Sequence, residues 1–456
     1  MLINSLPISK KAFQWCWTFV LFAATISEAQ TLEDYVQEGL KNNLVLQQKN
    51  VTLQQAQHSL RIAKSYFLPT VNVLADYTSG EGGRSIGIPV GDLLNPVYAS
   101  LNEMTQSDAF PQVENVNQNF FPKNFYDAKI RTSIPLVNTD LLINRSIQGQ
   151  QLMLRQYELD VYKRQLVLDI KTGYYNHLAA LSAIKIYESA LTLVQKNVEI
   201  NESLLRNGKA LPANVLRSRS ELERVKADVN DARNQLSNTR QYLNFLLNRD
   251  LNHEVVTTSL LESIVLTDTA SNMINKREEI QMIKTVRQIN NSSLQMSRLS
   301  RLPKVNAFLD LGTQAQDWKY NNDSRYYLVG VQLSIPVFQG FRNDITIRQN
   351  KLEIQKTEQH LRYTSKQLEM AMAISKNQLQ TSIQNFHAAQ EQLKSAKSYF
   401  NLVEKGYKEG VNSLIEFLDA RNQLTSSELQ LNLRQLEVLT AEANLERETA
   451  AYAIEN

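Results

Sequence analysis

The tripeptide Ser133-Ile134-Pro135 returns as Ser334-Ile335-Pro336, and these two copies decide the fold. Each copy ends a stretch in which apolar and polar residues alternate, and each opens a proline-free run of about seventy residues. The two runs reach glycine-bearing turns near Gly208 and Gly410. The sequence therefore predicts a tandem duplication, in which two strands feed one very long helix in each half.

Composition limits the class of protein. The chain has 456 residues and a formal net charge of +3, so nothing in it indicates a nucleic-acid partner. Its first 29 residues have the pattern of a signal peptide, with Lys10 and Lys11 before the short apolar core Trp15–Ala24 and small residues before a cut at Gln30. The only cysteine, Cys16, lies inside that segment. No stretch offers eighteen consecutive apolar residues, which excludes a helical membrane span and leaves a strand-built span open.

Four segments alternate with a period of two, at about 70–79, 125–135, 304–314 and 325–336. Leu74 and Phe308 are the exceptions to the alternation. Strands of this length with one apolar face, one polar face and aromatic residues near their ends are typical of outer-membrane barrels. A soluble antiparallel sheet is the alternative.

The segment 80–124 separates the first two strands and is rich in glycine and proline. This mixture predicts a long exposed loop without a helix. The equivalent loop of the second half, at about 314–325, is much shorter. Long loops on one side of a barrel are usually extracellular.

Helices account for most of the chain. A first helix is predicted at about 31–66, with a counterpart at about 277–302 after an irregular connecting segment at 249–275. Helical hairpins are predicted at 136–248 with a tip at about 207–212, and at 337–451 with a tip at about 408–412. The return helix of the first hairpin has apolar residues spaced alternately by three and four, which indicates a coiled coil: Leu222, Val225, Val229, Ala232, Leu236, Thr239, Leu243 and Leu246. The two repeats would span 30–250 and 276–456.

Four strands are too few for a barrel, because single-chain barrels begin at about eight strands. An open sheet edge in lipid leaves backbone groups without hydrogen bonds at several kcal/mol each. Several copies must then share one barrel, and the attached helices would continue its wall as a tube. Residue patterns alone leave two, three or four copies open.

Three segments carry a resemblance to a known family. They are Gly39-Leu40-Lys41-Asn42-Asn43, Arg277-Glu278-Glu279-Ile280 and the stretch from Tyr407 to Ala420. In this order they make the chain similar to TolC-type outer-membrane efflux channels over nearly all of its mature length. The resemblance implies a mainly α-helical homotrimer with a shared twelve-stranded barrel in the outer membrane and a helical tunnel in the periplasm. It also implies a periplasmic adaptor and an inner-membrane pump of the RND or ABC class as partners.

Glu416 and Asp419 are three residues apart on one helical face. The resemblance assigns them to the pore constriction, where a trimer would form two rings of carboxylates. The alternative from spacing alone is a solvated helix N-terminus, where acidic residues favour the helix dipole. Asn214 and Arg217 are the equivalent positions of the first repeat, and Arg217 is expected to pair with Glu416 or Asp419 of a neighbouring helix.

Further assignments follow from the resemblance and from the strand pattern. The tip residues Gly208, Lys209, Gly410 and Val411 are expected adaptor contacts, with a plain helix cap as the alternative. Asp127, Lys129 and Arg131 are expected to line the barrel lumen, with solvation near a loop as the alternative. The five histidines have no ligand spacing, which argues against a metal site, and no catalytic set or cofactor motif is present. The expected function is a passive exit duct; the alternative is an exported coiled-coil scaffold or adhesin without a pore. Substrate and pump class are open.

Overall fold

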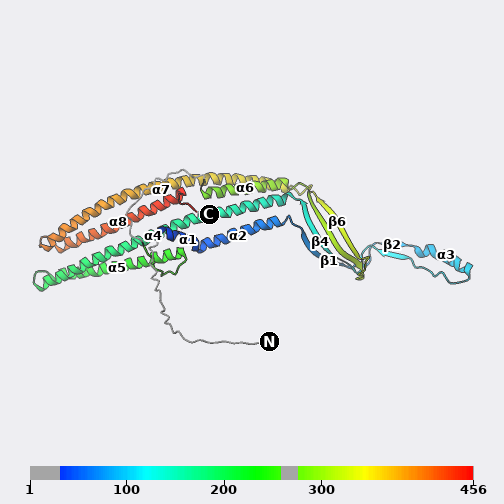
Figure 1. Cartoon of the computed structure of the whole chain (residues 1–456), viewed down its shortest axis with the longest axis horizontal. Helices are drawn as coiled ribbons and strands as arrows, with labels where there is room; N and C mark the ends of the chain where they lie inside the picture. Colours follow the sequence, from blue (N-terminus) through cyan, green and yellow to red (C-terminus); the bar gives the residue numbers. More distant parts are fainter. Residues whose placement is uncertain (1–30, 258–275, 455–456) are drawn as a thin grey trace, which may run out of the picture.

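The computed structural model describes residues 31–257 and 276–454, and it is an elongated, mainly helical molecule with a small sheet (Figure 1). Its helices are α1 (Leu32–Asn42), α2 (Leu44–Ser65), α3 (Val90–Thr105), α4 (Thr139–Arg206), α5 (Pro212–Leu247), α6 (Glu278–Leu299), α7 (Arg342–Lys408) and α8 (Leu414–Thr449). Its strands are β1 (Thr70–Thr78), β2 (Ser85–Ile88), β3 (Val116–Asn119), β4 (Phe125–Val137), β5 (Lys304–Gln316) and β6 (Arg325–Ser334). The predicted mainly α-helical fold with a few strands is confirmed. None of these helices combines the length and the hydropathy that crossing a membrane requires.

Two long helical hairpins extend from one end of the sheet, α4 with α5 and α7 with α8 (Figure 1). Helix α4 has 68 residues, which corresponds to about 100 Å at 1.5 Å per residue. It begins after Asn138, whose side chain accepts hydrogen bonds from the backbone N–H groups of Asp140 and Leu141. Of the eight positions predicted to form the seam of α5, six are buried, and Leu222 and Leu236 are half-buried.

The main sheet has four antiparallel strands in the order β1-β4-β5-β6. Its register pairs Thr70 with Ser133 and continues without a shift to Thr78 opposite Phe125. Strands β4 and β5 join the two halves of the chain, and their register shifts only between Pro135 and Val137. The two Ser-Ile-Pro copies thus mark the point at which each half leaves the sheet for its long helix.

The first predicted helix is wrong in one respect, because it is broken at Asn43. This residue ends α1 in an extended conformation and caps α2, where its Oδ1 accepts hydrogen bonds from the N–H groups of Val45 and Leu46. Its Nδ2 donates to the Leu246 carbonyl of α5 at 2.9 Å, and the Tyr162 hydroxyl of α4 donates to its Oδ1. Tertiary hydrogen bonds therefore stabilise the break.

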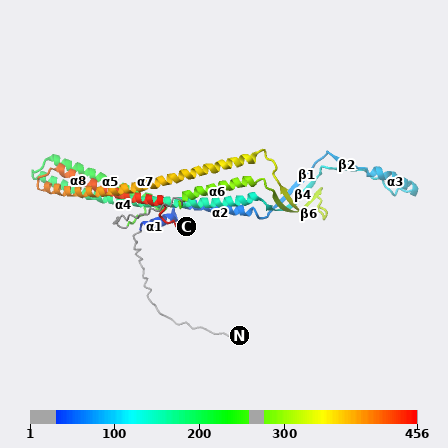
Figure 2. The same cartoon turned by 90° about the horizontal axis from the view of Figure 1, so that it is seen from above.

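The predicted helix-free loop at 80–124 is also wrong. It contains the 16-residue helix α3 and a small hairpin of β2 and β3, which project beyond the sheet (Figure 2). Pro96 lies inside α3, yet the helix continues because side chains hold it to the returning chain. Asn95 exchanges two hydrogen bonds with the backbone of Val113, and Asn102 exchanges two with the backbone of Phe110.

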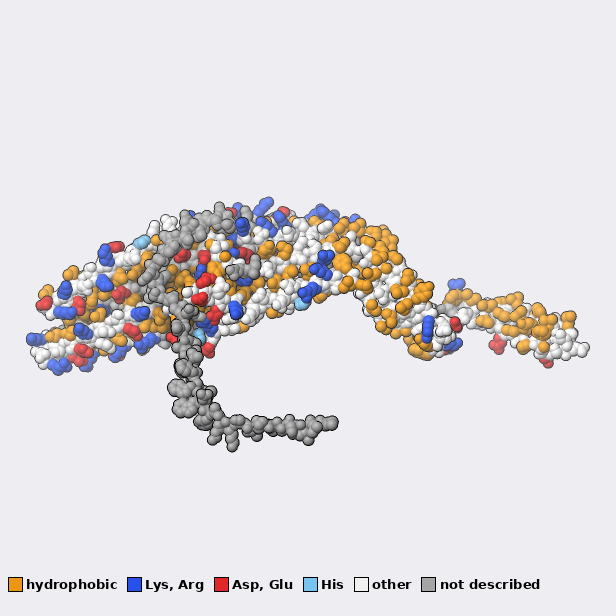
Figure 3. Space-filling view, in the orientation of Figure 1, with side chains coloured by type: hydrophobic (Ala, Val, Ile, Leu, Met, Phe, Trp, Pro, Cys, Tyr) orange, Lys and Arg blue, Asp and Glu red, His pale blue; other side chains and the backbone are white. Residues whose placement is uncertain are grey.

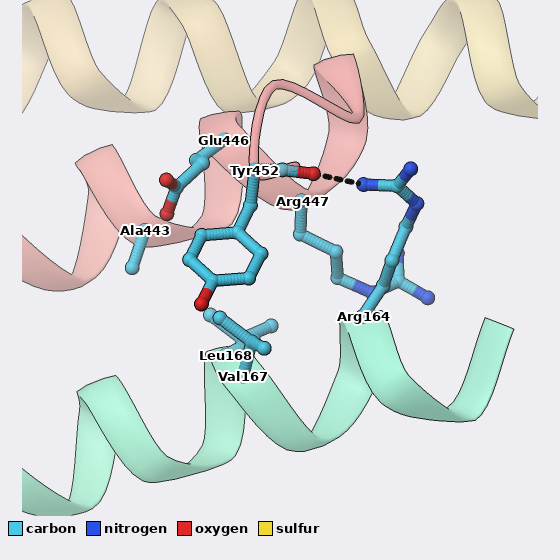
Figure 4. A pocket seen from close by; sticks show the side chains of 7 residues that line it. All are labelled: Arg164, Val167, Leu168, Ala443, Glu446, Arg447 and Tyr452. Atoms are coloured by element: carbon cyan, nitrogen blue, oxygen red, sulfur yellow. Dashed lines mark hydrogen bonds between the residues drawn. The ribbon is translucent and has the colours of Figure 1, made fainter. Parts of the chain in front are cut away.

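The main apolar core lies within the first half of the chain, away from the sheet. It contains buried residues of α1, α2, α4 and α5, including Tyr35, Ile170 and Leu247. The end of the chain closes over this region, since Arg164 donates to the Tyr452 carbonyl at 2.9 Å beside Val167 and Glu446 (Figure 4). The predicted signal peptide and residues 258–275 of the predicted connecting segment lie outside the described residues.

Candidate functional site

The four-stranded sheet has one apolar and one polar face. Because residues paired across strands point to the same side, the register defines rows of side chains. One row across all four strands consists of Val73, Ile130, Leu311 and Tyr327. All four are exposed in the single chain, and Tyr327 is 79% exposed. Figure 3 shows hydrophobic side chains gathered over this end of the molecule, whereas charged side chains occupy the helical part.

The opposite face carries charged residues that pair with one another. Arg131 on β4 makes two hydrogen bonds to the carboxylate of Asp310 on β5, at 2.7 and 2.6 Å, and Asp310 is only 1% exposed. Asp127 accepts from the Tyr326 hydroxyl at 2.7 Å and forms an ion pair with Lys129. The three residues predicted to line a lumen thus share this face. Arg131 pairs with Asp310, and Lys129 pairs with Asp127, so the charges of this polar face are compensated.

A glycine makes one of these contacts geometrically possible. A Cβ atom at Gly312 would lie 2.9 Å from the Ala128 carbonyl oxygen, the Lys129 Cβ and the Tyr326 Cζ. Because Gly312 has no side chain, the ring of Tyr326 on β6 crosses β5 and reaches Asp127 on β4. Any larger residue would displace the ring from the polar face.

Both outer edges of the sheet are open. Strand β1 pairs only with β4 and strand β6 only with β5 among the residues that the structure describes. Each edge strand therefore presents backbone donors and acceptors that no described strand satisfies. Such edges are templates for pairing with another strand.

The far ends of the hairpins are two exposed turns. Gly208 and Gly410 adopt φ values of 68° and 78°, the left-handed conformation that ends a helix and that glycine accepts without strain. Lys209 and Val411 follow them and are exposed, Val411 to 81%. All four predicted tip residues therefore lie at the ends of the hairpins and are accessible.

Glu416 and Asp419 lie on the exposed side of the first turns of α8. Glu416 forms a capping box with Ser413, whose backbone N–H donates to its carboxylate at 2.6 Å. This backbone hydrogen bond holds the pKa of Glu416 below its usual range. The capping alternative therefore describes Glu416 in the single chain, and both carboxylates still face outward.

Asn214 and Arg217 occupy the matching turn of α5, where Asn214 is half-buried and Arg217 is exposed. Within residues 31–257 and 276–454, no salt bridge joins Arg217 to Glu416 or Asp419. The predicted pairing is thus not formed inside one chain.

A different ion pair joins the hairpins. The Arg421 guanidinium on α8 donates to the Glu221 carboxylate on α5, and both residues are buried. Arg224 contacts the same carboxylate and also donates to Asn422 of α8 at 2.7 Å. Burial raises the pKa of Glu221, but the Arg224 hydrogen bond and the Arg421 charge outweigh it, so the net pKa is lowered. Sequence reasoning missed this pair, because neither residue belongs to a motif.

The first hairpin also has a polar seam near its tip. Asn197, Asn201 and Ser218 are buried and hydrogen-bonded to one another, with Asn201 Nδ2 donating to Ser218 Oγ at 3.2 Å. The Tyr407 hydroxyl of α7 donates to Asn201 at 3.2 Å. The second hairpin instead packs apolar side chains at this level, including Phe400 and Phe417. The two halves therefore differ where they approach each other.

Comparison with known families matches the model of the outer membrane efflux protein family at residues 35–249 and 270–450. The chain belongs to this family. Outer membrane efflux proteins are channels, so the chain is an efflux channel of the outer membrane, and the scaffold without a pore is not favoured.

Individual relatives are distant in sequence and close in fold. Outer membrane protein TolC of Escherichia coli K12 is 21% identical over 450 residues, which cover 92% of this chain and 82% of that protein. The Campylobacter jejuni CmeC outer membrane channel is 15% identical, with a TM-score of 0.75 over 98% of this chain and 94% of that one. The open-state Neisseria gonorrhoeae MtrE outer membrane channel is 16% identical, with a TM-score of 0.72 over 92% and 88%.

The two-faced sheet and the helical hairpins are the features of this chain that a channel function must account for. The relatives are channel proteins and not enzymes. In the described part of the chain, no group of three or more His, Cys, Asp and Glu side chains is arranged to hold a metal ion. The sequence could have identified Asp310 as a residue of the polar face, because it lies on the polar side of an alternating strand.

Proposed function

We propose that three copies of this chain close into one tube, with twelve strands forming a barrel in the outer membrane, four from each copy. One observation carries the proposal: the sheet is open at β1 and β6, apolar and exposed on one face and charged on the other. Pairing β1 of one copy with β6 of the next removes every edge, turns the apolar face to lipid and turns the charged face to water.

The hairpins then continue the wall into the periplasm as a helical tunnel. The duct is passive: an inner-membrane pump of the RND or ABC class drives the substrate, and a periplasmic adaptor joins the pump to the tunnel. The exposed tips at Gly208, Lys209, Gly410 and Val411 are the surfaces that such an adaptor would contact. Each copy contributes two repeats, so six tips would surround the opening.

The narrowest point of the tunnel is the start of α8. In a trimer, Glu416 and Asp419 form two rings of three carboxylates, which favour cations and repel one another. Both side chains are exposed and face outward from the single chain, as pore-lining residues require. Asn214 and Arg217 line the same level from α5, and Arg217 pairs with Glu416 or Asp419 of a neighbouring copy.

Two measurements on the purified full-length protein test the proposal. Its mass in detergent is expected to equal three chains, and insertion into planar lipid bilayers is expected to give discrete conductance steps. A monomer that stays soluble without detergent, or a trimer that never conducts, contradicts it. The second result would favour a scaffold without a pore.

A further inference from the structure

The extension formed by β2, α3 and β3 has no counterpart in the second half of the chain, where residues 317–324 alone connect β5 to β6. It continues beyond the sheet at the end opposite to the hairpins (Figures 1 and 2). One face of α3 is held to the returning chain. Asn95 and Asn102 hydrogen-bond to it, Tyr98 packs 5.8 Å from the Phe110 ring, and Asn115 caps the helix at Gly91.

The other face of α3 is apolar and mostly uncovered. Six apolar residues lie on this side of the helix: Leu93, Leu94, Val97 and Met104 are exposed, and Val90 and Leu101 are half-buried. Leu93 is 68% exposed, Val97 is 52% exposed and Met104 is 82% exposed, so no described part of the chain covers them. Figure 3 shows hydrophobic side chains along the extension. We refer to these six residues as the α3 apolar face.

The charges around this face argue against a lipid surface. Residues 85–122 contain Asp92, Glu103, Asp108 and Glu114 but no lysine or arginine. Helices that lie on a membrane combine their apolar face with Lys and Arg, which bind anionic headgroups. An acidic extension without basic residues lacks this attraction.

The size of the face argues against a free partner. A helix of 16 residues is about 24 Å long and about 10 Å wide, so its face offers roughly 240 Å². A stable interface between separate proteins buries about 800 Å² per partner. Copies already held in one assembly need far less area, because tethering gives an effective concentration in the millimolar range.

The position of the extension indicates which copies meet. It follows β1, the edge strand that faces the neighbouring copy in the proposed trimer, after the short connection at 79–84. We propose that the α3 apolar faces of the three copies pack against one another and form a crown beyond the barrel exit. This inference rests on the proposed trimer and adds a second contact between copies that the strands do not provide.

Single-cysteine variants of the full-length protein test the crown. Cys16 is the only cysteine of the chain and lies in the predicted signal peptide, so each variant places one thiol in the exported protein. Leu93→Cys and Met104→Cys place it on the α3 apolar face. Ala99→Cys is the matched control, since Ala99 is exposed on a different side of the same helix. A short bismaleimide joins two thiols, so one thiol per chain allows a covalent dimer and no larger product. At least ten-fold more covalent dimer is expected with the two test variants than with the control.

A second variant separates a specific contact from chance collisions. Val97→Glu places a charge in the α3 apolar face and is expected to reduce cross-linking of Leu93→Cys at least five-fold, while the mass of the assembly stays at three chains. If the mass is three chains but Met104→Cys cross-links no more than Ala99→Cys, the crown is wrong and the trimer stands. A monomeric mass overturns both. A third outcome would also overturn the crown. If Met104→Cys does not cross-link, and lipid protects its thiol from a polar maleimide until detergent is added, the face contacts lipid.

Discussion

Arg421 on α8 and Glu221 on α5 form a buried ion pair that joins the two hairpins close to their tips. The Arg421 side chain is 2% exposed and that of Glu221 is 8% exposed. Burial lowers the pKa of Arg421 from its ordinary value, and the charge of Glu221 partly opposes that effect. An arginine side chain stays charged at neutral pH. The folded protein can therefore bury this charge only because the Glu221 carboxylate neutralises it.

Removing the carboxylate alone should therefore be costly. Glu221→Gln leaves a buried guanidinium without its counter-ion and is expected to lower the free energy of unfolding by about 3 kcal/mol. The shift in the midpoint of urea unfolding in detergent measures this. Arg219→Gln is the control, because Arg219 is exposed and its partner Glu202 is only half-buried, and it should cost less than about 1 kcal/mol. The double variant Glu221→Gln/Arg421→Met should regain most of the loss; equal losses in all three variants would refute the coupling.

Charge removal at the start of α8 should change ion selectivity. Glu416→Gln and Asp419→Asn together remove both proposed carboxylate rings and are expected to reduce the preference for cations over anions several-fold. The reversal potential across a planar bilayer under a salt gradient measures this preference. Glu409→Gln is the control, since Glu409 is exposed at the C-terminal end of α7. An unchanged reversal potential in the double variant would show that these residues do not line the constriction.

His177 should make the protein less stable in mild acid. It is 3% exposed, and burial, aided by the nearby charge of Arg240, lowers its pKa from 6.5 to about 4. Its Nδ1 lies 3.3 Å from the Thr239 hydroxyl. The unfolded chain takes up a proton near pH 6.5, whereas the folded chain does so only near pH 4, so stability present above pH 6.5 is lost as the pH falls between these values.

The full loss would be about 3 kcal/mol. His177→Gln is expected to flatten the dependence of the melting temperature on pH between 6.5 and 4. His387→Gln is the control, because His387 is exposed on α7 and should leave the dependence unchanged. Parallel pH curves for the wild type and His177→Gln would mean that His177 does not carry this dependence.

The local stability of the α3 extension should depend on the hydrogen bonds of Asn95. Asn95→Ala removes both hydrogen bonds to the half-buried Val113 and leaves its backbone N–H and C=O without these partners, which costs about 1–3 kcal/mol. Hydrogen exchange of residues 107–115 is expected to accelerate about ten-fold, because a factor of ten corresponds to about 1.4 kcal/mol. Glu103→Ala changes an exposed side chain of the same helix and should leave the exchange as it is. If both variants behave alike, the asparagine does not hold the helix.

Much of the architecture was predictable from the sequence, because long periodic segments report burial directly. The four main strands begin and end within a few residues of their predicted positions, and Leu74 and Phe308 were identified as exceptions to the alternation. Phe308 lies on the polar face, where the Arg131 guanidinium stacks 4.9 Å from its ring centroid. This exception to the pattern therefore corresponds to a contact with a charged residue of the polar face.

Helix α3 could not be predicted by composition, because the glycines of its segment lie before the helix or in its first turn, at Gly91, and Pro96 was counted as a breaker. Its stability comes from Asn95 and Asn102, which bond to residues later in the chain. The buried polar residues of α4 could not be predicted for a similar reason. Asn197 and Asn201 are buried, and polar residues give no apolar periodicity to read.

The open strand edges have a consequence before the channel exists. In the proposed trimer, a copy that has not yet met its neighbours carries two open strand edges, β1 and β6, and an exposed apolar sheet face. Strand edges pair with whatever other edges they meet, so the yield of channels depends on how well copies are kept apart during transit. Overexpression beyond the capacity of the chaperones that bind the unassembled chain would therefore produce aggregates in place of additional channels.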